Sequence, residues 1–600
     1  MNKHALFHQA KSEYSYQFDE KKLHILFKTA KNDVNSVSLS FGDPFDWQYS
    51  NGKAHWVSNL FVMEKRYQTD DFDYYFIEVE PKDYRCKYAF LIQADEGIFF
   101  YGSKRLEKLD KLPSNDFLEG SFYDLSNYFN YPYLNKEDLS DTPSWVRQTV
   151  WYQIFLDRFY SKRKNSKLPW GKLPVSNHEF YGGDILGVIE KLPYLKELGI
   201  TGIYFTPIFE ANSAHKYDTI DYYKIDPQFG TNEQFGMLVK EAHKLGIKIV
   251  LDAVLNHCGW NHPFFQDVVK HGRNSKYANC FFLDKDPIIN FKIDQFGKPV
   301  YEHNLRPNYR TFAYTPHMPK WNTSDKIAEK HLLGSIEYWI KTYDIDGWRL
   351  DVSNEISHDF LRKVKEVTKK AKKDTFIFGE NWDSSIPWLR GDQMDAVMNY
   401  DLSIPMWQYF EDKINLEEFK NELISYTANT PKNVIRNMFN QLDTHDTVRM
   451  LRRLKDNPER LKIAYLMMFA SAGAPNIYYG SEVGLTGDHD PDNRRCFNWN
   501  ESSWNMSLRN FIKKLIELRN TYSAFMESDY HFIDQNSLSF VKKSATHELL
   551  FLINDKNQSM TLTITDNLVG RYKDLLNNEV FNLEKSCQLD AFDYKILIKY

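Results

Sequence analysis

The stretch GWRLDVSNE, Gly347 to Glu355, decides how this chain folds, because an apolar run meets a polar run within it. Side chains alternate along a β-strand, so Arg349 and Asp351 are predicted to project from the same side of a strand end. A guanidinium beside a carboxylate favours the charged form, and an ionised, oriented aspartate is what a covalent carboxylate nucleophile needs. A purely structural ion pair is the alternative, and this stretch alone does not separate the two.

Apolar runs alternate with helical stretches on both sides of this segment, over residues 146–525. Eight runs are predicted to be strands: VWYQIFLDRF, GITGIYFTPIF, IKIVLDAVLNH, YDIDGWRLDV, DTFIFGEN, QMDAVMNY, VIRNMFNQLDTHD and APNIYYGSE. The helical stretches LGVIEKLPYLKELG and NEQFGMLVKEAHKLG each end in a glycine that can take the left-handed cap. Eight βα units favour an α/β fold, the closed (β/α)8 TIM barrel, over an open sheet.

The remaining segments predict further domains. Residues 1–125 carry short β-branched or aromatic runs broken by turn residues, which indicates an N-terminal β-sandwich of carbohydrate-binding type. Residues 126–145 are polar and contain prolines, so we expect a linker there. The stretch of about 258–322 after the third strand is too long for an ordinary loop and predicts an inserted subdomain. Residues 526–600 return to β and predict a C-terminal antiparallel domain.

Composition excludes several classes of protein. A net charge of −5 over 600 residues gives no excess of positive charge, so we expect no nucleic-acid partner. The first twenty residues lack a signal-peptide core, and no apolar run reaches membrane-spanning length, so we expect a soluble cytoplasmic protein without a membrane partner. Five cysteines without CxxC spacing indicate reduced thiols rather than disulfides or a zinc site.

Polar clusters fall at the ends of the expected third, fourth, fifth and seventh strands. The βα loops of a barrel open on one face, so residues at these strand ends gather on one rim. The clusters comprise Asp252, Asn256 and His257, then Arg349 and Asp351, then Glu380, and finally His445 and Asp446. Each residue alone could be a cap or a salt-bridge partner, but four clusters on one rim indicate a functional site.

These residue types predict glycoside chemistry, in which one carboxyl attacks the anomeric carbon and another protonates the leaving oxygen. Asp351 is the predicted nucleophile. Glu380 lies in FIFGENW, an apolar strand end beside a tryptophan, where low polarity would raise its pKa and keep it protonated as the general acid. Asp446 is predicted to hold sugar hydroxyls, while His257 and His445 donate hydrogen bonds to the same ring.

Four motifs carry a family resemblance. In their order and spacing, DAVLNH, GWRLDVSNE, GENW and LDTHD resemble the signature regions of the α-amylase family of retaining glycoside hydrolases, and the resemblance covers essentially the whole chain. Within that family, HKYDTIDYYKIDPQFG, MPKWN and DPDNRRCFNW make the chain most similar to the neopullulanase, cyclomaltodextrinase and maltogenic amylase group.

The resemblance implies Asp351 as nucleophile, Glu380 as acid/base and Asp446 as transition-state stabiliser. It also implies residues that bind the sugar on either side of the scissile bond. These are His257, His445, His215 and Tyr217 in the subsite before the bond, Asp490 and Arg494 at its far side, and Trp382 and Glu355 at the acceptor side. Arg349 is implied to bind at the same site and to orient the nucleophile.

Members of this group cleave α-1,4 and sometimes α-1,6 bonds in cyclodextrins, pullulan and maltooligosaccharides, and many also transfer glycosyl units. They are commonly cytoplasmic dimers in which the N-terminal domain of one subunit helps wall the cleft of the other. We therefore expect a retaining α-1,4-glucan hydrolase that forms a homodimer through its N-terminal domain. An oligo-1,6-glucosidase or a glucan transglycosidase is the alternative, and a non-catalytic glycan-binding protein is a third, against which the intact carboxylates argue.

The chain departs from the group at three places. Trp321 stands in MPKWN where leucine is usual, which predicts a narrowed or re-lined cleft, and Val448 replaces a common proline or glutamate near the acceptor side. The segment YSKRKNSK is basic where calcium-binding members carry Asn and Asp ligands, and Asp184 alone remains. A Lys/Arg run repels a hard cation, so no cofactor is expected to be required and a calcium site is not favoured.

Overall fold

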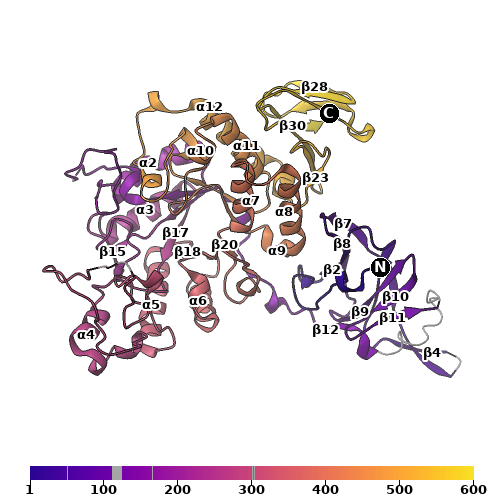
Figure 1. Cartoon of the computed structure of the whole chain (residues 1–600), viewed down its shortest axis with the longest axis horizontal. Coiled ribbons are helices and arrows are strands. Elements are labelled where there is room, and N and C mark those ends of the chain that lie inside the picture. The colour runs from indigo at the N-terminus through magenta and orange to yellow at the C-terminus, as the bar shows by residue number, and fades with distance from the viewer. Residues whose placement is uncertain (51, 111–124, 165, 301, 303) are drawn as a thin grey trace. The chain divides into compact units, whose positions relative to one another are not determined.

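The computed structural model describes residues 1–50, 52–110, 125–164, 166–300, 302 and 304–600 (Figure 1). The chain divides into two compact units. One unit comprises residues 1–141 together with 417–435, and the other comprises residues 142–416 together with 436–600. Helices α8 (Leu416–Asn429) and α9 (Lys432–Ile435) therefore group with the N-terminal unit, although they lie in the stretch expected for the barrel.

The larger unit is built on a sheet of eight parallel strands in the order β20-β19-β18-β17-β14-β13-β22-β21. A parallel bridge between Met398 and Phe439 joins the two ends of this order, so the sheet closes. The predicted (β/α)8 barrel is therefore confirmed. Its strands are β13 (Trp151–Ile154), β14 (Gly202–Phe205), β17 (Lys248–Ala253), β18 (Gly347–Leu350), β19 (Phe376–Gly379), β20 (Ala396–Val397), β21 (Phe439–Gln441) and β22 (Ala474–Tyr478).

The helices between these strands start and stop where their sequences provide caps. Helix α2 (Ile185–Leu198) begins after Asp184, whose side chain accepts the N–H of Gly187, and ends at Gly199 with φ 99°. Helix α3 (Asn232–Lys244) begins with a capping box formed by Thr231 and Gln234. Both predicted helices are confirmed, because capping satisfies the N–H and C=O groups that a helix end leaves unpaired.

The register of the barrel decides which polar side chains meet. Asp252 on β17 lies directly beside Arg349 on β18, and Leu350 lies beside Gly379 on β19. Every residue of β18 and β19 is buried, as expected for parallel strands with both faces covered. The residues that follow these strands, Asp351 and Glu380, therefore emerge together at one end of the barrel.

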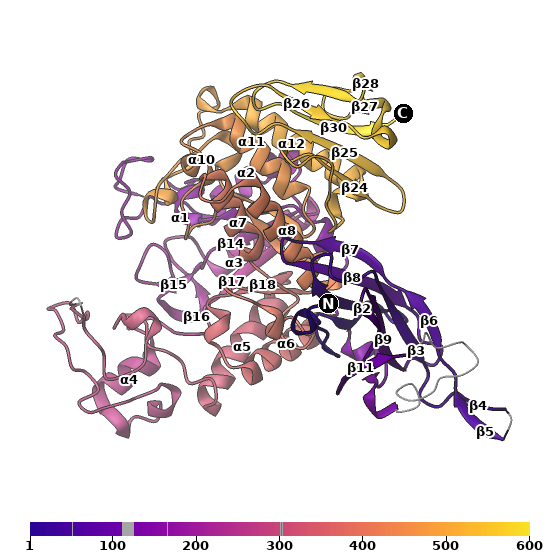
Figure 2. The ribbon, with the colours of Figure 1, turned by 45° about the vertical axis from the view of Figure 1, so that its right-hand side comes forward.

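The first and last residues of the insertion after β17 lie next to each other. A bridge between His257 and Lys320 closes its base, and another between Phe281 and Trp321 extends the pairing. Helix α4 (Pro263–His271) lies within it, and both views show this helix projecting beyond α5 (Lys326–Tyr343) (Figures 1 and 2). The expected inserted subdomain is thus present, and its base lies at the site residue His257.

The N-terminal unit contains the predicted β-sandwich. One sheet has the order β1-β2-β8-β7 and the other β11-β10-β9-β3-β6. Strand β12 (Phe129–Tyr131) pairs with β9 (Cys86–Ala94), so the stretch expected to be a linker contains a strand of the sandwich. Residues 111–124, just before the expected domain boundary at 125, lie outside the described residues. The other strands are β1 (Ser15–Gln17), β2 (Leu23–Ala30), β3 (Ser36–Gly42), β6 (Asn59–Val62), β7 (Glu64–Gln68), β8 (Phe72–Val79), β10 (Gly97–Tyr101) and β11 (Leu106–Leu109).

The C-terminal segment forms the predicted antiparallel domain, with a six-stranded sheet ordered β23-β24-β25-β30-β27-β28 and the pair β26-β29. Figures 1 and 2 both show it beside α11 (Pro458–Phe469) and α12 (Met506–Thr521). The rings of Phe511 on α12 and Tyr594 on β30 (Tyr594–Lys599) lie 4.9 Å apart. None of the helices in the described part of the chain combines the length and apolarity that a membrane span requires.

Candidate active site

Arg349 is the centre of the site, because its guanidinium contacts three carboxylates from three strand ends. Its Nη1 donates to Asp351 Oδ1 at 2.7 Å and to Asp252 Oδ2 at 2.9 Å. Its Nη2 lies 2.8 Å from Glu380 Oε2. The Arg349 side chain is fully buried. The predicted Arg349–Asp351 pair is thus confirmed, and it belongs to a larger cluster that also holds the predicted general acid.

Glu380 does not have the apolar surroundings expected from its sequence context. Its Oε2 accepts the backbone N–H of Val352 at 3.1 Å in addition to facing Arg349, and its Oε1 accepts the indole N–H of Trp382 at 3.0 Å. The prediction of an apolar site is therefore wrong. Val352 donates from a backbone with φ 45°, a strained conformation for a β-branched residue. That strain turns the N–H toward the carboxylate.

The charges in this cluster do not balance, since Asp252, Asp351 and Glu380 share the single positive charge of Arg349. Burial raises the pKa of Asp351 well above its usual range; the guanidinium opposes this shift, while the carboxylates of Glu380 and Asp252 add to it. Arg349 therefore favours the ionised form of Asp351 against the effect of burial.

Asp252 connects this cluster to a second group around His445. Its Oδ2 accepts the hydroxyls of Tyr204 at 2.7 Å and Tyr217 at 3.1 Å. Tyr217 stacks on the ring of His445, with centroids 5.5 Å apart and planes inclined by 9°. Gln153 Nε2 lies 2.7 Å from Nδ1 of the His445 ring. These contacts hold two predicted sugar-binding side chains against each other.

Asp446 lies at the open side of this group, with 30% of its side chain exposed. His445 Nε2 lies 3.0 Å from its Oδ2, and Arg494 Nη2 donates to its Oδ1 at 3.2 Å. Loss of water around the carboxylate favours the neutral acid, but His445 and Arg494 outweigh it and hold the pKa of Asp446 below its usual range. Asp490 binds Arg494 Nη1 at 2.9 Å. Asp446 is thus an ionised, accessible acceptor.

His215 and His257 are neutral and lie beside this group, with His257 buried and His215 half-buried. Burial lowers the pKa of His257 to about 3 and that of His215 to about 4. His215 Nδ1 accepts the backbone N–H of Tyr217 at 3.1 Å. The ring of His257 stacks on Phe312 at 5.0 Å, and its Nε2 has no hydrogen-bond partner within the described residues.

Trp382 and Glu355, predicted at the acceptor side, differ in their surroundings. The indole of Trp382 is 40% exposed and stacks on Tyr400, with centroids 3.8 Å apart. Glu355 is half-exposed and forms an ion pair with Lys320 at 3.0 Å. A supported, exposed ring next to the Glu380 carboxyl can receive the apolar face of a sugar.

The expectation that Trp321 narrows or re-lines the cleft is not what the structure shows. The Trp321 side chain is 2% exposed, its indole donates to the Tyr222 hydroxyl at 3.0 Å, and its ring stacks on Phe281 at 4.8 Å. Trp321 is therefore buried between Phe281 of the inserted subdomain and Tyr222 on β16 (Thr219–Ile225). Val448, the other departure near the acceptor side, is 8% exposed.

The basic segment before α2 does not fit a calcium ion. The carboxylate of Asp184 accepts the backbone N–H groups of Lys162, Arg163 and Gly187 at 3.0, 2.9 and 2.7 Å. Its oxygens are therefore already engaged in capping and turn formation, whereas Ca²⁺ needs six to eight oxygen ligands. Asn165, the one amide in this run, lies outside the described residues. In the part of the chain that the structure describes, no three His, Cys, Asp or Glu side chains cluster as metal ligands do.

Several side chains of the site were missed by sequence reasoning. Gln153 on β13 orients His445, Tyr204 on β14 donates to Asp252, and Asn177 links Asp490 to Arg494 at 3.0 and 3.1 Å. Gln153 and Tyr204 sit inside apolar runs that read as buried strands, so a polar atom in a barrel strand was the available signal. Nothing in the sequence around Asn177 marks it.

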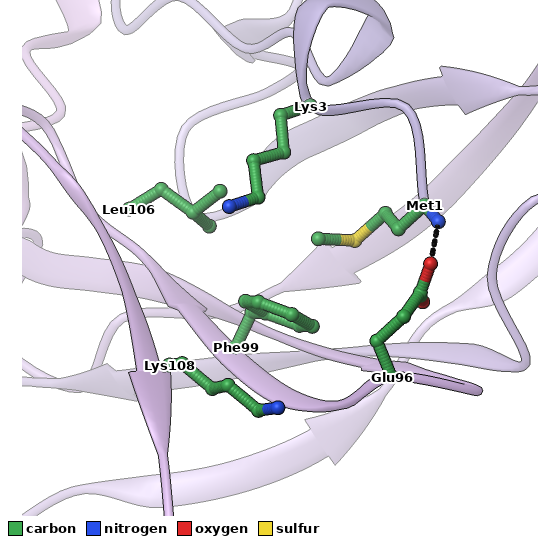
Figure 3. Close-up of a pocket in the computed structure, with 6 residues that line it drawn as sticks. All are labelled: Met1, Lys3, Glu96, Phe99, Leu106 and Lys108. Atoms are coloured by element: carbon green, nitrogen blue, oxygen red, sulfur yellow. Dashed lines mark hydrogen bonds and ion pairs between the residues drawn. The ribbon is translucent and has the colours of Figure 1, made fainter.

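A separate hollow of about 270 Å³ lies within the N-terminal unit (Figure 3). Phe99 lies between Lys3 and Lys108 there, with the two ammonium groups 5.8 and 6.0 Å from its ring centre. The figure shows the amino group of Met1 turned toward Glu96, with which it forms an ion pair. None of the predicted site residues lines this hollow.

Family models match most of the chain. A model described as alpha amylase, catalytic domain, matches residues 153–522, and one described as alpha amylase, N-terminal ig-like domain, matches residues 1–135.

Individual proteins are similar over nearly their full length. A cyclomaltodextrinase of Geobacillus thermopakistaniensis is 38% identical over 594 residues, which is 97% of this chain and 96% of the relative. An intracellular maltogenic amylase of Bacillus subtilis is 38% identical, over 95% of this chain and 94% of the relative. A solved cyclomaltodextrinase structure superposes with a TM-score of 0.90 at 33% identity and covers both chains completely.

Proposed function

Because this chain belongs to the α-amylase family of glycoside hydrolases, we propose that it hydrolyses α-1,4-glucosidic bonds of cyclodextrins, maltooligosaccharides and pullulan with retention of anomeric configuration. The assignment of the catalytic residues rests on the guanidinium of Arg349, which contacts both proposed catalytic carboxyls. Arg349 fixes both Asp351 and Glu380 from neighbouring strand ends. One carboxyl can therefore attack a sugar carbon while the other serves the leaving oxygen.

In the first step an oxygen of Asp351 bonds to the anomeric carbon, and the bond from that carbon to the glycosidic oxygen breaks. Glu380 gives its proton to the departing oxygen. Both protein partners of Oε2, Arg349 and the Val352 N–H, are donors. Trp382 likewise donates to Oε1, so donors contact both oxygens of the Glu380 carboxyl. The products of this step are a glycosyl ester on Asp351 and a free sugar hydroxyl.

In the second step Glu380 takes a proton from water, and the water oxygen bonds to the anomeric carbon as the bond to Asp351 breaks. Asp351 returns as a carboxylate and Glu380 as an acid. Two displacements at the same carbon restore its configuration.

The surrounding side chains position the sugar and stabilise the transition state. We assign Asp446 to the hydroxyls of the ring before the scissile bond, because it is ionised and accessible. We assign His257 and His445 to the same subsite. The remaining contacts of this subsite come from His215, Tyr217, Asp490 and Arg494, while Trp382 and Glu355 serve the acceptor side.

The test is Asp351→Asn, with Asp359→Asn on the surface of α6 (His358–Ala371) as the matched control. The carboxylate of Asp359 is 77% exposed, so its loss leaves turnover unchanged. Asp351→Asn is expected to lower kcat on β-cyclodextrin by about 10⁴-fold or more while still binding substrate. Proton NMR of the first product is expected to show the α-anomer. Unchanged turnover, or an initial β-anomer, would remove the assignment.

Glycosyl transfer is a second candidate activity, favoured by the exposed Trp382 ring next to Glu380. A sugar stacked there can offer its hydroxyl to the glycosyl ester in place of water. Chromatography of products from maltotriose distinguishes the activities, since transfer yields chains longer than the substrate. Products from isomaltose and pullulan test the alternative preference for α-1,6 bonds.

We further propose a cytoplasmic homodimer that associates through the N-terminal domain. The family resemblance supports the dimer, and the intracellular relative supports the compartment. Exposed rings around the hairpin of β4 (Trp47–Ser50) and β5 (Lys53–Trp56) offer an apolar contact, with Phe45 74% and Tyr49 83% exposed. Light scattering is expected to give twice the monomer mass, and Phe45→Ser with Tyr49→Ser to reduce it. A monomeric parent protein would exclude the dimer.

We propose that no metal is required, since Asp184 is engaged by backbone N–H groups. EDTA is expected to leave both activity and Tm unchanged. A Tm that falls with EDTA and returns with Ca²⁺ would contradict this.

A further inference from the structure

Lys216 lies between two residues of the proposed sugar site, His215 and Tyr217, and its own side chain is buried away from solvent. Its backbone has φ 64°, a conformation that residues with a Cβ disfavour. The segment lies between β15 (Phe209–Ala211) and β16 (Thr219–Ile225). Such a conformation persists only when the surrounding contacts impose it.

The ammonium group of Lys216 supplies those contacts. Its Nζ lies 2.7 Å from Asp226 Oδ2 and donates to Gln228 Oε1 at 2.7 Å and to the Ala211 carbonyl at 3.2 Å. An ammonium has three protons, so all three are satisfied. The faces of two rings, Phe180 and Phe229, lie 4.9 and 5.3 Å from the same nitrogen.

Asp226, the partner of the Lys216 ammonium, also binds the backbone of the hairpin formed by β15 and β16. Its carboxylate also accepts the backbone N–H groups of Ala211 at 3.1 Å and Gln228 at 2.9 Å. One buried ion pair therefore fixes both ends of the hairpin relative to residue 216.

The residues on either side of Lys216 contact the proposed active site. The hydroxyl of Tyr217 donates to Asp252 at 3.1 Å, and its ring is stacked on His445. The Tyr217 N–H donates to His215, so the two flanking side chains are oriented together. A shift of the backbone at residue 216 therefore moves both.

We propose that Lys216 is a positioning residue for the glycosidase reaction: its buried ammonium, held by Asp226, Gln228 and Ala211, fixes Tyr217 and His215 in the subsite before the scissile bond. The inference rests on the proposed function and adds to it a residue that does not touch the sugar. The carboxylates that act on the ammonium are Asp226, Asp218 and Asp157. Lys216 therefore acts on Asp351 and Glu380 only through the residues it positions.

The experiment replaces Lys216 with methionine in the full chain and uses Lys224→Met as the matched control. Lys224 lies on β16 and forms an ion pair with Glu210 at 2.9 Å, but its side chain is 52% exposed. We expect Lys216→Met to lower kcat/KM on β-cyclodextrin by about 10- to 100-fold, mostly in kcat, because a misplaced group costs transition-state stabilisation. Lys224→Met is expected to stay within about twofold of the parent.

The pH profile separates positioning from a general structural role. A displaced Tyr217 no longer donates to Asp252, so the carboxyl cluster holds its proton more tightly. The acid limb of kcat/KM then moves to higher pH, by about half a unit or more. Rates are compared at a temperature where circular dichroism shows each variant fully folded. Lys216→Arg keeps the charge and is expected to recover most of the lost kcat.

A folded Lys216→Met with parental kcat/KM and an unmoved acid limb would overturn the proposal. If Lys216→Met does not fold, Gln228→Met tests the proposal instead. This variant keeps the Lys216–Asp226 ion pair and removes one hydrogen-bond acceptor of the Lys216 ammonium. A loss of about threefold with the limb moved upward supports positioning, and parental behaviour overturns it. A failure of the proposed function gives a different result: Asp351→Asn would remain active, whatever activity the Lys216 variants show.

Discussion

Arg349→Met removes the one positive charge that three carboxylates share, so its effect follows directly from the geometry. The guanidinium nitrogens lie 2.7 to 2.9 Å from Asp351, Glu380 and Asp252. Unit charges about 4 Å apart interact by about 4 kcal/mol at an effective dielectric constant of 20. One pKa unit corresponds to about 1.4 kcal/mol, so the pKa of the nucleophile rises by up to about three units.

The variant is therefore expected to move the acid limb of kcat/KM upward by up to about three pH units and to lower kcat/KM near neutral pH by about 10³-fold. Its stability changes with pH in a defined direction. Carboxyls whose folded pKa is raised above the unfolded value stabilise the fold below the unfolded pKa, and this stability is lost as pH rises through the folded pKa. The Tm deficit of the variant is thus larger at pH 8 than at pH 5.

The assay is kcat/KM on β-cyclodextrin from pH 4 to 9, with thermal unfolding over the same range. Arg452→Met serves as the control, because Arg452 pairs with Asp456 on the surface and its side chain is 51% exposed. An Arg349→Met enzyme with a parental acid limb, or with kcat/KM within about threefold of the parent, would refute the reasoning.

Three further predictions concern the general acid, the acceptor side and the buried histidines. Glu380→Gln is expected to lose about 10²- to 10⁴-fold on β-cyclodextrin but far less on α-glucosyl fluoride, whose leaving group needs no proton; equal losses would contradict the acid role. Trp382→Ala is expected to lower the ratio of transfer to hydrolysis on maltotriose, as seen by chromatography, and an unchanged ratio would remove it from the acceptor side. Burial lowers the pKa of His8 and of His257 to about 3. Since these folded pKa values lie below the unfolded value, Tm is expected to fall as pH drops from 6.5 toward 4, and a flat profile would contradict this.

Much of the fold could be predicted from the sequence, because parallel strands are continuous apolar runs and their ends are polar. All eight barrel strands were found in this way, and so were the strand-end residues Asp351 and Glu380. Strand β12 was missed, since it has only three residues, lies directly before the polar run of the expected linker, and pairs with β9 through a long-range contact. The grouping of α8 and α9 with the N-terminal unit is likewise invisible to local patterns.

The structure brings the predicted residues Asp351 and Glu380 together, but local sequence did not reveal their surroundings. Local sequence placed Glu380 in apolar surroundings, whereas Arg349 and the Val352 N–H approach it through the fold. Trp321 was expected at the cleft because its neighbours in the chain belong to a motif, yet Tyr222 and Phe281 bury it. The role of Lys216 depends on Asp226 and Gln228, ten and twelve residues further along the chain.

The central claim is that the enzyme forms a temporary covalent bond to the sugar through Asp351. The most direct measurement incubates the protein with 5-fluoro-α-glucosyl fluoride, whose glycosyl ester breaks down slowly, and analyses the digested protein by mass spectrometry. The adduct is expected on the peptide that contains Asp351, and to be absent from Asp351→Asn. An adduct on another carboxylate, or an inactivated enzyme that carries no adduct, would contradict the account.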